Sequence, residues 1–154
     1  MNEGKMTGRT ITLMFIGSFI AMFITMYAMV DSWAHVYVNI NKIYMSGLMA
    51  ASMGIIQVMV MSSMFSTKTR YVLFLSSVAS VFLLFVFIRQ QFAVDNIRFL
   101  KSMIPHHSSA ILMCEHANIT DPEIASLCDE IVKTQLDEIS TMERMLRERG
   151  VGRP

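Results

Sequence analysis

Charged side chains are scarce in this sequence, and the first two thirds of the chain carry few of them. Of 154 residues, 16% are charged and 53% are hydrophobic, and the mean hydropathy is +0.47. This apolar content is too high for an ordinary soluble domain. The net charge of +1 also lacks the basic excess of a nucleic-acid-binding protein. We therefore expect a lipid bilayer, and no nucleic acid, as a partner.

Cysteine is scarce as well, because only Cys114 and Cys128 occur. Two cysteines do not make the disulfide framework of a small secreted domain. They fall on opposite arms of the helical hairpin expected below. Three alternatives remain open for them: a disulfide in an oxidising compartment, a metal site, or two inert core residues.

Sets of residues typical of catalysis are missing too. A di-iron carboxylate bundle needs Glu-x-x-His pairs, but Glu115 and His116 are adjacent and neither hairpin arm contains such a pair. No nucleophile with a matching base and no glycine-rich phosphate loop is recognisable. We expect no enzymatic activity.

Three uncharged stretches dominate the first part of the chain, at about residues 10–30, 43–65 and 71–88. With a rise of about 1.5 Å per residue, each helix is comparable in length with a hydrocarbon core of ~30 Å. We therefore predict a three-span transmembrane domain over residues 10–91, preceded by a polar tail at 1–9.

Lysine and arginine in the short loops indicate the orientation of these spans. Two such cations lie in the N-terminal tail, two in the turn 66–70 and one in the loop 31–42. This distribution predicts the orientation of a multi-pass membrane protein. Its N-terminus is expected in the cytoplasm and its C-terminal domain outside.

Methionine is abundant, with 16 residues. Met45, Met49 and Met53 recur at every fourth position of the second span, and Ser46, Ala50 and Gly54 form a line of small residues there. Small residues let membrane helices approach closely. The methionine stripe has two interpretations, as packing between helices or as an intramembrane copper track.

The C-terminal part predicts an antiparallel helical hairpin domain over residues 92–150, followed by a short tail at 151–154. Its arms are expected at 92–117 and 123–149, with Thr120 and Glu123 as a capping box at the start of the second arm. No glycine or proline lies between the third span and Pro105. We therefore expect one uninterrupted helix to run from that span into the first arm.

The first arm concentrates nitrogen and sulfur donors in one short stretch: Met103, His106, His107, Met113 and Cys114. At about 100° per residue, these side chains share one broad face of a helix. Imidazole and soft sulfur ligands are typical of copper or zinc sites.

The second arm carries an apolar line with alternating steps of four and three residues, typical of packed helices: Ile124, Cys128, Ile131, Gln135, Glu138, Met142 and Met145. Gln135 and Glu138 interrupt it with polar groups. They either reach water at its edge, or orient or ligate His106 or His107 from across the hairpin, as carboxylates do for metal-bound histidines.

The run from Phe99 to Met113, with its Met-Ile-Pro-His-His core, resembles the signature of domain of unknown function 305, a bacterial ferritin-like helical family. The later run Thr120-Asp-Pro-Glu-Ile matches the same pattern, and the resemblance covers about residues 92–149. Some members are periplasmic copper-binding proteins linked to copper tolerance. The resemblance therefore implies a copper site, with zinc as the alternative, on the motif positions Met103, His106, His107, Met113, Gln135, Glu138 and Met142.

Familiar soluble members of this family often hold two His-His hairpins in one chain, whereas this sequence has one, preceded by apolar spans. One hairpin buries little core. We therefore expect a homodimer or higher homo-oligomer that completes a four-helix bundle. Cys114 stands outside the family motif.

With the resemblance to a bacterial family, the leading functional expectation is a membrane-anchored copper-binding protein of the bacterial inner membrane. It would act in copper tolerance or in handoff to a copper-handling partner protein. The alternative is a non-catalytic membrane module whose hairpin dimerises or docks a partner. In that case the histidines serve packing or pH sensing.

Overall fold

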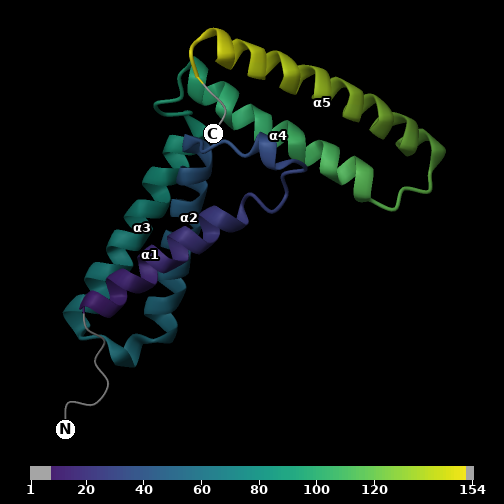
Figure 1. The fold of residues 1–154 in the computed structure, drawn as a ribbon. Helices are drawn as coiled ribbons and strands as arrows, with labels where there is room; N and C mark the ends of the chain where they lie inside the picture. Colours follow the sequence, from purple (N-terminus) through teal and green to yellow (C-terminus); the bar gives the residue numbers. More distant parts are fainter. Residues whose placement is uncertain (1–7, 152–154) are drawn as a thin grey trace. The chain divides into compact units, whose positions relative to one another are not determined.

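The computed structural model describes residues 8–151, and this range is all-α, as the sequence predicts. Its helices are α1 (Gly8–Thr25), α2 (Ile40–Val60), α3 (Thr67–Arg89), α4 (Asn96–His116) and α5 (Pro122–Glu148), shown in Figure 1. Two short 3-10 helices, η1 (Trp33–His35) and η2 (Ser62–Met64), lie in the connections. The predicted tails at 1–9 and 151–154 fall almost wholly outside the described residues.

The described chain divides into two compact units. The first, the apolar-helix unit, comprises residues 8–26 and 41–92 and contains α1, α2 and α3. The second, the hairpin unit, comprises residues 27–40 and 93–151 and contains α4 and α5. The segment 27–40 therefore belongs with the hairpin, whereas the sequence analysis placed residues 27–30 in the first span and 31–42 in a loop.

Two described helices, α2 and α3, are long and apolar enough to cross a membrane, with mean hydropathies of 1.6 and 2.5. The apolar stretch Arg9–Thr25 of α1 is shorter than such a helix. The predicted first span at 10–30 therefore overruns the observed helix. The chain turns after Thr25, and the Tyr27 hydroxyl donates a hydrogen bond of 2.8 Å to the carbonyl of Tyr37.

Small residues on α2 permit close contact within the apolar-helix unit. Ser46, Ala50 and Gly54 are all buried. A Cβ atom at Gly54 would overlap the Phe15 ring and lie 2.9 Å from the Ser77 Oγ. The predicted line of small residues is thus a packing surface.

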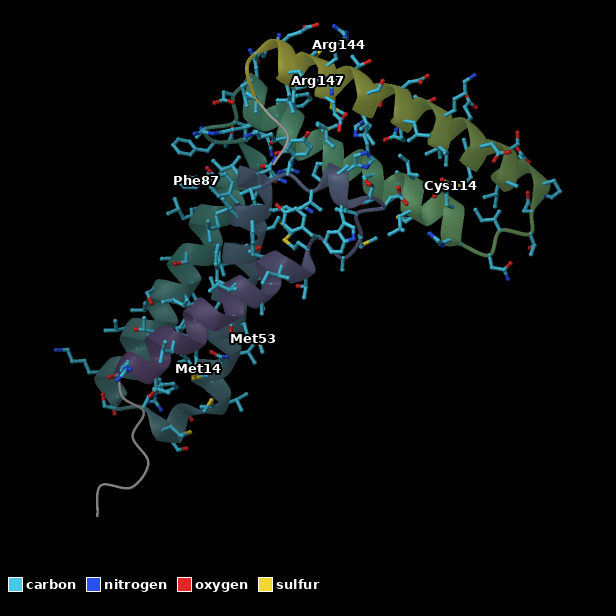
Figure 2. The ribbon with its side chains drawn as sticks, in the orientation of Figure 1. Met14, Met53, Phe87, Cys114, Arg144 and Arg147 are labelled. Atoms are coloured by element: carbon cyan, nitrogen blue, oxygen red, sulfur yellow. A yellow bond between two sulfur atoms is a disulfide. The ribbon has the colours of Figure 1, made fainter. Side chains whose placement is uncertain are left out.

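The methionine stripe on α2 is more open than this line. Met49 and Met53 are 43% and 41% exposed, and Met45 is half-buried. Met53 is labelled in Figure 2.

The prediction of one uninterrupted helix from the third span into the hairpin is wrong. Helix α3 ends at Arg89, and Gln91 and Ala93 take positive φ angles of 48° and 56°, which a right-handed helix does not allow. The Asp95 carboxylate then accepts a hydrogen bond of 2.8 Å from the Arg98 N–H. This N-cap starts α4 as a separate helix.

Helices α4 and α5 form the predicted antiparallel hairpin (Figure 1). Helix α4 passes through Pro105 as a single element. On α5, Arg144 pairs with Glu148 at 2.9 Å, and Arg147 pairs with Glu143 at 3.5 Å; both arginines are labelled in Figure 2. These pairs follow the i, i+4 spacing of helix neighbours.

The N-terminus of α5 corrects the predicted capping box. Asp121, rather than Thr120, is the N-cap, and its carboxylate accepts hydrogen bonds from the N–H groups of Glu123 and Ile124 at 2.9 and 3.2 Å. A carboxylate at this position also interacts favourably with the partial positive charge of the helix N-terminus.

The core of the hairpin unit draws on three segments and consists of Tyr37, Leu100, Ile104, Ile111, Ile139, Met142 and Leu146. On α5, this core uses Ile139 and Leu146, each one residue beyond Glu138 and Met145 of the predicted line. Ile124, the first residue of that line, is 51% exposed.

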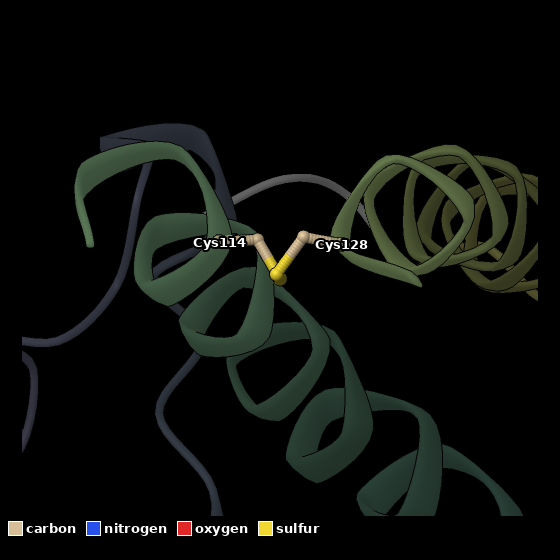
Figure 3. Close-up of a disulfide and its surroundings, with 2 residues drawn as sticks. All are labelled: Cys114 and Cys128. Carbon is tan, nitrogen blue, oxygen red and sulfur yellow. A yellow bond between two sulfur atoms is a disulfide. The ribbon is translucent and has the colours of Figure 1, made fainter. Parts of the chain in front are cut away.

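A disulfide joins Cys114 on α4 to Cys128 on α5, with their Cα atoms 5.3 Å apart (Figure 3). Of the three alternatives for these cysteines, the structure contains the disulfide. The bond closes the end of the hairpin next to the connecting turn.

Candidate metal centre

His107 lies on α4 with its ring held from two sides. Its side chain is 10% exposed, and its Nδ1 lies 2.9 Å from the carbonyl oxygen of Met103, one turn earlier. A carbonyl only accepts, so Nδ1 carries the proton of this hydrogen bond. This arrangement directs Nε2 across the hairpin toward α5, and it is the orientation in which metal-binding histidines are commonly fixed.

Glu138 on α5 meets the other ring nitrogen. Its Oε2 lies 2.6 Å from Nε2 of His107, and 51% of its side chain is exposed. A metal cation bound at Nε2 would replace this contact between His107 and Glu138.

A groove of about 530 Å³ opens beside this pair and is lined by α4 and α5. Its wall includes three methionines, Met103, Met142 and Met145, together with His107 and Glu138. Thioethers and imidazole are ligands that suit Cu(I), and imidazole and carboxylate also suit Zn²⁺. The groove thus combines donors from both arms of the hairpin.

Four other residues expected at the site do not line this groove. Gln135 is half-buried, His106 is exposed and Met113 is 59% exposed. Cys114 is bonded to Cys128 and offers no thiolate.

The two histidines diverge because adjacent residues point about 100° apart on a helix. Their ring centroids are 5.9 Å apart, with an angle of 65° between the planes. The helix face that the sequence analysis assigned to the donors is therefore only partly directed at the groove, and His106 lies outside it.

Sequence reasoning missed several groove residues. Met145 was placed on the apolar line of the second arm but not among the ligands, and Thr134, Asp137 and Thr141 were not singled out. Their spacing of three or four residues along α5 was the available signal.

The segment 27–40 packs on α4 beside the candidate centre. Fully buried Ser108 accepts a hydrogen bond of 3.0 Å from the Asp31 N–H, and its Oγ lies 3.0 Å from His35 Nδ1. Burial raises the pKa of Tyr27, which keeps its hydroxyl protonated as a donor to Tyr37. Residues on both sides of η1 therefore anchor this segment.

Comparison with known proteins identifies a family and a relative that aligns with nearly the whole chain. A family model described as "Domain of unknown function (DUF305)" matches residues 90–151. The chain is 34% identical over 148 residues to "Uncharacterized protein L153" of Acanthamoeba polyphaga mimivirus, across 94% of this chain and 95% of that protein. No solved structure matches the chain.

Proposed function

Because this chain belongs to the family described as domain of unknown function 305, we propose that its hairpin is a metal-binding module, and that the metal is copper. The observation that carries the proposal is the convergence of Met103, Met142, Met145 and His107 on one groove. Three thioethers beside one imidazole favour Cu(I) over harder cations such as Mg²⁺ or Ca²⁺.

The chain's own groups supply the binding chemistry. His107 presents Nε2 while its Nδ1–H stays bonded to the Met103 carbonyl. Glu138 is half-exposed and free to swing toward water, or it remains as a ligand beside the histidine. Copper bound at Nε2 would replace the contact between His107 and Glu138.

The membrane anchor is part of the proposal. Only 28% of the apolar window of α2 and 6% of that of α3 are buried, so these helices expose apolar surface that lipid would cover. We propose that α1 crosses the bilayer with them, as a third and shorter span. The loop cations favour a cytoplasmic N-terminus and an extracytoplasmic hairpin in a bacterial inner membrane.

The disulfide agrees with this orientation. Bonds such as Cys114–Cys128 persist in oxidising compartments and are rare in the cytosol. A hairpin outside the membrane would be placed to bind copper there, for tolerance or for handoff to a copper-handling partner protein.

The test is Cu(I) affinity of the purified full-length protein, measured by competition with a chromogenic Cu(I) chelator. We expect His107→Ala to weaken Cu(I) binding by at least about tenfold, since loss even of a supporting contact costs 10–100-fold at metal sites. Met103→Leu/Met142→Leu should act in the same direction, because leucine keeps the volume and removes the sulfur.

The matched control is His106→Ala, which removes an exposed imidazole outside the groove. It should leave Cu(I) affinity unchanged. Equal losses in both single histidine variants would contradict the groove and favour the exposed His-His pair. Absence of Cu(I) binding in the wild type would overturn the proposal itself.

Exposed apolar residues on the hairpin favour a second candidate function, an interaction module that dimerises. On α4, Phe99 and Met113 are 51% and 59% exposed, and on α5, Ile124 and Leu127 are 51% and 55% exposed. His106 lies seven residues from both Phe99 and Met113, so the three share one side of α4. Pairing two hairpins over this side would complete a ferritin-like four-helix bundle.

Light scattering of the detergent-solubilised protein tests this pairing. We expect a dimer for the wild type and a shift to monomer in Met113→Asp/Leu127→Asp, because buried carboxylates oppose apolar association. Lys133→Asp, on an exposed position of α5, is the control for added charge. A monomeric wild type would rule out self-association through this side.

A further inference from the structure

A second group of metal-ligating side chains lies in the hairpin unit, away from the groove. It consists of Asp31 in the segment 27–40, and of Glu115 and His116 at the C-terminal end of α4. One ligand atom from each residue lies within 4.8 Å of the other two. None of the three lines the methionine groove.

These donors come from two segments far apart in sequence, and each segment is anchored. The Asp31 N–H is bonded to buried Ser108 at 3.0 Å, which fixes the backbone next to its carboxylate. Glu115 and His116 directly follow Cys114, whose disulfide to Cys128 restrains this end of α4. The cluster is therefore held together by contacts other than its own.

The charges in the cluster favour a bound cation. Two carboxylates lie close together, yet among residues 8–151 neither forms an ion pair with a lysine, arginine or histidine. They also lie near the C-terminus of α4, which carries partial negative charge. These charges favour a bound cation, and the His116 imidazole offers a nitrogen ligand.

We propose that Asp31, Glu115 and His116 form a second metal site, which takes a divalent first-row cation of the zinc and manganese class. Carboxylate oxygen and imidazole nitrogen bind Zn²⁺ at about 2.0–2.2 Å, and small rotations of exposed side chains bring donors within 4.8 Å to that radius. Water completes the coordination, because all three residues are exposed. The donor set contains no sulfur, so its preference differs from that of the groove.

Zinc titration of the full-length, disulfide-bonded protein tests the site. The probe is Zn²⁺ alone, followed by calorimetry in a buffer that does not bind metals. We expect Asp31→Asn, Glu115→Gln and His116→Gln each to weaken Zn²⁺ binding by at least about tenfold. Asp129→Asn and His106→Gln are matched controls at exposed positions outside the cluster, and both should bind Zn²⁺ like the wild type.

Further variants separate this proposal from the copper groove. His107→Ala should leave Zn²⁺ binding at the cluster intact, whatever its effect on Cu(I). Ser108→Ala should weaken Zn²⁺ binding while circular dichroism shows unchanged helix content, because Ser108 positions Asp31. The proposal is overturned if the wild type binds no Zn²⁺, if the three isosteric variants bind it equally well, or if only His107→Ala abolishes binding.

Discussion

At the scale of single residues, Asp121 determines where α5 begins. Its carboxylate satisfies two N–H groups that the helix cannot bond internally. The sequence analysis expected Thr120 in this role, one residue earlier, and both residue types are good N-caps. The choice of Asp121 places Pro122 at the first helical position.

Asp121→Ala should therefore destabilise the hairpin by about 1 kcal/mol, the usual cost of a lost cap. Thermal unfolding of the full-length protein, followed by circular dichroism, measures the effect. Thr120→Ala is the control and should be nearly neutral. A larger loss in Thr120→Ala than in Asp121→Ala would restore the capping box predicted from the sequence.

The sequence could not predict which of the two adjacent histidines, His106 or His107, points toward the groove. The stretch 103–114 identified the donor types, and the apolar line of the second arm included Glu138, which contacts His107 in the structure. Neither pattern determines which of two adjacent histidines turns inward, because this depends on the rotation of α4 about its axis. Packing of Ile104 and Ile111 in the core settles that rotation.

At the scale of elements, Gly54 shows how closely α2 is approached by its neighbours. The Phe15 ring and Ser77 occupy the space that any Cβ atom would need. Spacing alone predicted this surface, because small residues recur at every fourth position. The spacing could not indicate at which glycine of the unit an added Cβ atom would meet the closest neighbours.

Gly54→Ala should destabilise the apolar-helix unit by about 1–3 kcal/mol, as overpacking commonly does. Gly17→Ala on α1 is the matched control, since nothing lies within 4 Å of its added Cβ. That change should be neutral or slightly stabilising, because alanine favours helix. Thermal aggregation in detergent compares the two variants, and equal effects would contradict the close packing at Gly54.

The predicted line on α5 differs from the observed core by a rotation of the helix. Ile139 and Leu146 are buried in the core, whereas Glu138 is exposed and Met145 is only partly buried against the core. The core cluster also contains Tyr37, from a segment that periodicity could not assign to the hairpin. Glu138 and Met145 line the groove instead.

At the scale of the whole molecule, the disulfide connects stability to compartment. Cys114 and Cys128 are separated by 14 residues. Closing a loop of this size restricts the unfolded chain by about 3 kcal/mol in the entropic model. A cytosolic location would forfeit that contribution.

Cys114→Ser/Cys128→Ser should therefore lower hairpin stability by about 2–4 kcal/mol. Denaturant unfolding of wild type and variant, each with and without a thiol reductant, measures this. Reductant should lower the free energy of unfolding of the wild type to that of the variant, and it should leave the value of the variant unchanged. If complete reduction leaves the free energy of unfolding of the wild type unchanged, the disulfide adds nothing to stability.

The hairpin unit is assembled from two pieces of chain with α2 and α3 between them. During synthesis, residues 27–40 leave the ribosome before α2, α3 and α4 exist. At about 5–20 residues per second, several seconds pass before the partners of Asp31 and Tyr37 on α4 and α5 are made. The hairpin unit can therefore fold completely only after α2 and α3 have been synthesised. A fragment that starts at α4 would lack the segment 27–40, which contributes Tyr37 to the core.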